Sequence, residues 1–98
     1  MALKTRPYDS AEYLEDDESI EAYLQESLNT ALEIGDPSFL TQALGTVARA
    51  RGMSQVAQAS GLSRESLYKS LSAEGNPEFG TVLRVMQAMG LKLTIKAA

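Results

Sequence analysis

Residues Ser54–Leu71 read SQVAQASGLSRESLYKSL, and this stretch decides the fold. It predicts a short helix, a tight turn and a second helix. Gly61 can adopt the left-handed backbone conformation that ends a helix, and Ser63 is a good N-cap for the next one. Leu62 and Leu67 face a core from either side of the turn. Together these features indicate a helix-turn-helix motif.

The second helix of such a motif lies in the major groove of double-stranded DNA, so we expect the chain to bind DNA. Arg64 is the main candidate for base recognition because a guanidinium bonds guanine O6 and N7 together, and contact with phosphate alone is the alternative. Lys69 fits a phosphate contact, whereas Tyr68 contacts the DNA backbone or covers the core. Gln55 holds a phosphate or has no partner, and Asn76 contacts DNA or is only a helix cap. The expected DNA-binding residues are Gln55, Ser63, Arg64, Glu65, Ser66, Tyr68, Lys69 and Asn76.

The composition argues against an enzyme. The 98 residues include no Cys and no His, which removes thiolate chemistry, disulfides and the commonest general base and metal ligand. The acidic run 15–18 lacks the spaced ligands and glycine of a calcium-binding loop, and a solvated helix start explains it better. We therefore expect no cofactor and no metal. No apolar run is long enough to span a bilayer and no signal-peptide core is present, so we expect a cytoplasmic protein.

Charge divides the chain into two parts. Residues 1–36 hold two basic and ten acidic residues, whereas residues 37–98 hold seven basic and three acidic ones. The basic part can bind the phosphates of DNA. DNA would repel the acidic part, which therefore binds a different partner or simply faces water. We therefore predict an acidic N-terminal arm with helices over 1–36 and a DNA-binding domain over 37–98.

Capping signals place the helices of the N-terminal part. Asp9 and Glu12 resemble a capping box, which predicts a one-turn helix at about 10–14. Asp16 or Asp17 can cap a longer helix that stops at Gly35. Its apolar residues recur at helical spacing and are expected to face the core: Ile20, Leu24, Leu28, Ala31 and Leu32.

Two similar signals start the later helices. Asp36-Pro37 predicts a helix that ends at Gly52, and Asn76-Pro77 predicts one that ends at Gly90. The second helix of the motif is expected to fade near Glu74-Gly75. In the helix that starts at Asp36-Pro37, the residues predicted to face the core are Phe39, Leu40, Ala43, Leu44, Val47 and Ala48. In the helix that starts at Asn76-Pro77, they are Phe79, Val82, Leu83, Met86 and Met89.

The last residues change period. Leu91, Leu93 and Ile95 alternate with polar residues, which predicts a half-buried strand. A lone strand lacks a neighbour for its backbone groups, and the simplest neighbour is its copy in a second subunit or a strand from another protein. These three residues are therefore expected to form a homodimer interface.

The four helices expected over 37–90 look like the lambda-repressor-like, all-α fold. The segments 61–69 (GLSRESLYK) and 75–79 (GNPEF) resemble the HigA-like addiction-module antidote proteins, and so do 5–9 (TRPYD) and 21–24 (EAYL). The resemblance covers nearly the whole chain. One position departs from the usual motif, because Ser70 stands where an aliphatic residue is expected, with Leu71 next to it.

The resemblance implies an antitoxin that binds a small basic toxin of the RelE/ParE fold and represses their joint promoter at an operator. Charge complementarity with a basic partner points to the acidic part, so toxin contacts are expected at Glu12, Glu15, Asp16, Asp17 and Tyr23. The alternative is that these acids only face water. Two other functions are a stand-alone prophage-type repressor without a toxin, and a protein-interaction module that no longer touches DNA.

Overall fold

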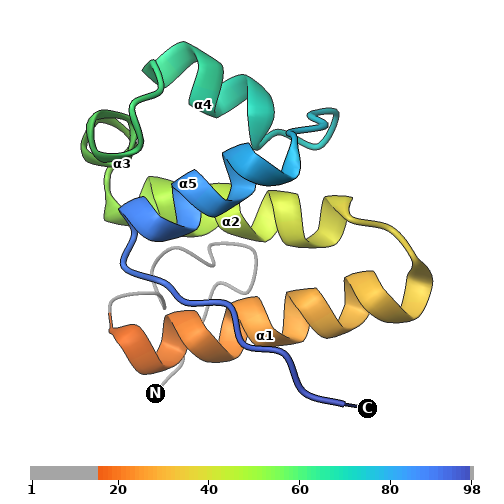
Figure 1. The fold of residues 1–98 in the computed structure, drawn as a ribbon. Helices are drawn as coiled ribbons and strands as arrows, with labels where there is room; N and C mark the ends of the chain where they lie inside the picture. The colour runs from red at the N-terminus through yellow and green to blue at the C-terminus, as the bar shows by residue number, and fades with distance from the viewer. Residues whose placement is uncertain (1–15, 98) are drawn as a thin grey trace, which may run out of the picture.

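The computed structural model describes residues 16–97, and this part of the chain is all-α, as predicted (Figure 1). Its helices are α1 (Asp17–Ile34), α2 (Ser38–Arg51), α3 (Met53–Ser60), α4 (Arg64–Ser70) and α5 (Phe79–Ala88). α1 and α2 form a hairpin, and α3 packs against α2, α4 and α5. None of the described helices is long and apolar enough to cross a membrane. The one-turn helix predicted at about 10–14 lies outside the described residues.

One core joins all five helices. Its most deeply buried large side chains are Ile20, Leu44, Val47, Leu67 and Val85. Ile20 comes from the acidic part of the chain and the others from the basic part, yet all belong to a single buried cluster. Because α1 contributes Ile20 and Leu24 to this cluster, it packs as part of the bundle and covers α2.

Local capping sets the ends of α1 and the start of α2 as predicted. Asp16 is the N-cap of α1, and Gly35 ends the helix in the left-handed conformation at φ 80°. The Asp36 carboxylate accepts a hydrogen bond from the Ser38 backbone N–H at 3.0 Å, and Pro37 is already helical at φ −66° and ψ −14°. The Asp-Pro signal therefore works as expected.

The helix predicted after Asn76-Pro77 forms as α5, but it begins at Phe79 with Glu78 as its N-cap, so the predicted start was wrong. α4 ends at Ser70 rather than near Gly75, because the Ser72 hydroxyl donates to the Lys69 carbonyl at 3.0 Å and the chain turns there. Residues 71–74 turn, residues 75–78 have no regular secondary structure, and Glu78 is extended (φ −65°, ψ 154°), so α5 begins at Phe79. Asn76 is a loop residue and not a helix cap.

Helical periodicity also predicted core positions for some side chains that are exposed in the structure. Leu32 is 74% exposed and Phe79 is 65% exposed, and Phe39 and Leu83 are also largely exposed. The spacing identifies an apolar face correctly, but no neighbouring helix reaches the ends of that face. Ser70, in contrast, is tolerated in α4 because Leu71 is buried in its place.

The predicted C-terminal strand does not form within the single chain. Residues 91–97 run along α1 without regular secondary structure, and Ile95 is 88% exposed (Figure 1). A strand requires a neighbouring strand to bond its backbone groups, and the described part of the chain has none to offer. Only Leu91 of the three alternating residues packs against the core.

Candidate nucleic-acid interface and neighbouring surfaces

The turn between α3 and α4 presents the first turn of α4 to solvent. Gly61 adopts the left-handed conformation at φ 78°, which ends α3. Ser63 then caps α4, because its hydroxyl oxygen accepts a hydrogen bond from the Ser66 N–H at 3.0 Å. Arg64 and Glu65 follow and are exposed with Ser63 and Ser66. Leu67 is fully buried and anchors the helix, so this polar turn is held in a fixed position.

Arg64 and Tyr68 form a pair on the exposed side of α4. The guanidinium carbon lies 5.6 Å from the centre of the Tyr68 ring, and Nη2 is 3.4 Å from the Tyr68 hydroxyl. Such a contact is worth about 0.5–1 kcal/mol at an exposed site. Tyr68 is 43% exposed, so it supports the arginine from outside the core more than it covers the core. Tyr68 therefore helps to position the Arg64 guanidinium without neutralising its positive charge.

The other residues expected at DNA occupy three elements. Gln55 is exposed in the first turn of α3, and its side-chain amide lies near the backbone of Gly52 at the start of that helix. Lys69 is exposed near the end of α4. Asn76 is exposed in the loop before α5 and lines a hollow with Lys69 and Ser70 at the end of α4. The first turn of α4 is therefore the best-defined part of the candidate interface.

Sequence reasoning missed Arg84, which fixes the end of α3. Its Nε and Nη2 atoms donate to the Ser60 carbonyl at 3.1 and 2.8 Å. This carbonyl belongs to the last turn of α3, where backbone oxygens lack partners within the helix. Arg84 comes from α5, twenty-four residues along the chain, so helical spacing gives no signal for the contact.

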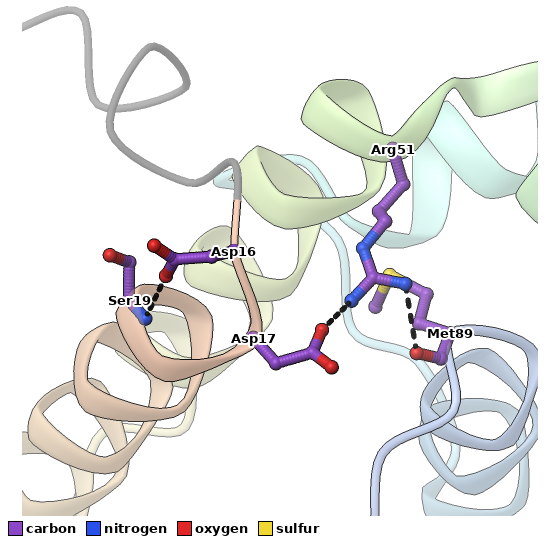
Figure 2. A network of polar contacts seen from close by, with 5 residues as sticks. All are labelled: Asp16, Asp17, Ser19, Arg51 and Met89. Carbon is purple, nitrogen blue, oxygen red and sulfur yellow. Dashed lines mark hydrogen bonds and ion pairs between the residues drawn. The ribbon is translucent and has the colours of Figure 1, made fainter.

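Two acidic residues at the start of α1, Asp16 and Asp17, bond to other residues of the same chain (Figure 2). The Asp16 carboxylate accepts a hydrogen bond from the Ser19 N–H at 2.8 Å. This bond and a weaker contribution from the Ser19 side chain hold the pKa of Asp16 below its ordinary value. Asp17 pairs with Arg51 at 3.1 Å, and the same guanidinium donates to the Met89 carbonyl at 3.3 Å. Arg51 thus links the start of α1 to the end of α5.

These contacts bear on the residues expected to bind toxin. Asp16 and Asp17 have structural partners, and Tyr23 is half-buried against the core. Glu12 and Glu15 lie outside the described residues. Within residues 16–97 no group of three or more acidic, Cys or His side chains is placed to hold a metal ion.

A groove of about 570 Å³ lies where the end of α1, the start of α2 and the loop before α5 meet. Figure 1 shows these segments at one end of the bundle. Its lining is mainly apolar and includes Leu28, Leu32, Leu40, Pro77, Phe79 and Val82. Residues 63–66 of the candidate nucleic-acid interface do not line it. The sequence analysis did not find this groove, because its parts are far apart along the chain.

Comparison with known proteins identifies the family. The family model described as "probable addiction module antidote protein" matches residues 4–97. An uncharacterized protein of Haemophilus influenzae is 43% identical over 96 residues, which cover 98% of this chain and 95% of that protein. No solved structure matches the chain. The chain belongs to the family of probable addiction module antidote proteins.

Proposed function

We propose that this member of the antidote family is the antitoxin of a type II toxin–antitoxin pair. It neutralises a RelE/ParE-like toxin by direct binding and represses its own operon as a DNA-binding dimer. The family match over residues 4–97 is the observation that carries the antitoxin role. An antidote needs a toxin, and the ten acidic residues among the first 36 favour a small basic protein as that partner. The role is one of binding and not of catalysis.

The DNA-binding part of the proposal is supported by the α3–turn–α4 segment. Ser63 and Leu67 hold the first turn of α4 in place, and Arg64 projects from it. Seven basic residues among 37–98 supply the attraction to phosphate that such binding requires. We assign base recognition to Arg64 and backbone contacts to Gln55 and Lys69.

A mobility-shift titration with the DNA upstream of the chain's own gene tests this assignment. Arg64→Ala should weaken binding by about 1–3 kcal/mol and relax selectivity at one or two base pairs. Arg64→Lys keeps the charge and loses the paired donors, so it should restore affinity for non-specific DNA but not selectivity. An equal loss on all sequences would make Arg64 a phosphate contact. No DNA binding by the wild-type chain even at low salt would leave only a protein-interaction module.

The dimer part of the proposal rests on residues 91–98. Leu93 and Ile95 are exposed and alternate with Lys92 and Thr94, a pattern that suits pairing with a second copy. Deleting 91–98 should give monomers that bind the operator much more weakly, because two half-sites are no longer coupled. Sedimentation velocity reports the change directly. An unchanged dimer after the deletion would exclude strand pairing.

A further inference from the structure

The groove at the end of the bundle has features that the fold itself does not explain. Leu32 and Phe79 line it and are 74% and 65% exposed in a chain of only 98 residues. They come from opposite sides of the groove, Leu32 from α1 and Phe79 from the first residue of α5. Large apolar side chains that gather around a hollow on a small protein mark an interaction site more often than chance exposure does.

Charge around the groove is mainly acidic. Asp36 lines it directly. Glu74 and Glu78 are exposed and stand next to lining residues of the loop before α5. Lys69 is the basic residue nearby, because it lines an adjoining hollow with Glu74, Gly75, Asn76 and Pro77. An acidic border around an apolar hollow repels nucleic acid and attracts a partner whose own apolar side chains are surrounded by Lys and Arg.

We propose that this groove, between the end of α1, the start of α2 and the loop before α5, is the main docking surface for the basic toxin. The inference rests on the proposed function for the identity of the partner. It places the main contact at the end of α1, where apolar side chains surround a hollow, rather than at its start, where Asp17 already pairs with Arg51. Apolar side chains of the toxin fill the groove between Leu32 and Phe79, and its cations face Asp36 and Glu78.

The position of the groove bears on whether one chain can bind the toxin and DNA together. The groove shares no residue with the exposed first turn of α4. A toxin docked there leaves Arg64 open but covers Asn76, which lines the groove, so base recognition by the first turn of α4 stays possible while toxin is bound. α2 is the element that both regions share through the core, since Leu44 in its middle lines the groove and packs in the same buried cluster as Leu67.

Calorimetric titration with the purified product of the small open reading frame beside the gene tests the proposal. Leu32→Lys adds a charge of the partner's own sign at an exposed position, and it should weaken binding by about tenfold or more. Phe79→Ala removes the facing side chain and should have a similar effect. Ile34→Lys is the matched control, because Ile34 is 62% exposed on the same helix and does not line the groove. It should change affinity by less than about threefold.

The outcomes separate this inference from the proposed function. If the wild-type chain binds and the groove variants bind equally well, the toxin docks elsewhere and the antitoxin role stands. If the wild-type chain does not bind this probe, both proposals fail. A change in the sedimentation of free Leu32→Lys would show that a second copy fills the groove. A fall in its melting temperature of more than about 4 °C would show that a segment of this chain already covers it, and either result overturns the inference.

Discussion

Replacing Arg84 by Met should loosen the end of α3 and thereby the turn that presents α4. Two guanidinium N–H groups donate to the Ser60 carbonyl at 2.8 and 3.1 Å. A hydrogen bond to a charged group contributes about 1.5–3 kcal/mol when buried, but Arg84 is exposed and solvent reduces this figure. Interaction of a cation with a helix C-terminus contributes about 0.3–1 kcal/mol. We therefore expect Arg84→Met to lower the free energy of unfolding by about 1 kcal/mol.

Urea unfolding followed by circular dichroism measures this loss. With a urea dependence of about 1–3 kcal/mol per molar, the midpoint should fall by roughly 0.5 M and the melting temperature by about 4–8 °C. Arg64→Met is the matched control, because Arg64 is also exposed but contacts only Tyr68. A loss below about 0.3 kcal/mol for Arg84→Met, or an equal loss for both variants, would refute the proposed capping role.

Three further predictions concern stability. Leu67→Ala should cost about 2–5 kcal/mol, measured by urea unfolding, because Leu67 is fully buried; a loss below about 1 kcal/mol would mean that α4 is not held by this anchor. Gly75→Ala should destabilise the fold by about 1–3 kcal/mol, because the added Cβ would lie 2.2 Å from the Ser70 carbonyl oxygen. Gly80→Ala in α5 is the comparison: its Cβ meets nothing within 4 Å, so the higher helix propensity of alanine should raise the melting temperature. Hydrogen bonds from Ser38 hold the pKa of Asp36 below its ordinary value, so Asp36 stabilises the fold above about pH 4 and loses this effect as the pH falls through its folded pKa. The difference in stability between wild type and Asp36→Ala should therefore shrink as the pH falls below about 4, and a constant difference would contradict the capping by an ionised carboxylate.

The parts of the fold that short-range chemistry controls were predictable from the sequence. Asp16, Gly35, Gly61 and Ser63 each form or end a helix through bonds to residues within five positions, so their side chains and backbone signal the boundary directly. Asn76-Pro77 carries the same kind of signal and fails. A cap permits a helix start, and the path of the loop from α4 to α5 decides whether it is used.

The rest depended on which segments meet in space. Periodicity indicated an apolar face that included Leu32 and Phe79, but it cannot say where the neighbouring helix ends. The contacts of Arg51 with Met89 and of Arg84 with Ser60 join residues 38 and 24 positions apart, so no spacing rule reveals them. The candidate DNA-binding turn was visible in the sequence because it is one continuous segment. The groove was not, because two stretches far apart along the chain, 28–44 and 75–82, form it.

The antitoxin role is tested most directly by co-expression with the product of the small open reading frame beside the gene. Only this chain carries a tag, and growth is measured along with what the tag captures. The account predicts that the neighbour alone stops growth, that this chain restores it, and that the two purify in fixed proportion. A neighbour that does not bind, or growth that stays arrested in the presence of the folded chain, would contradict the account.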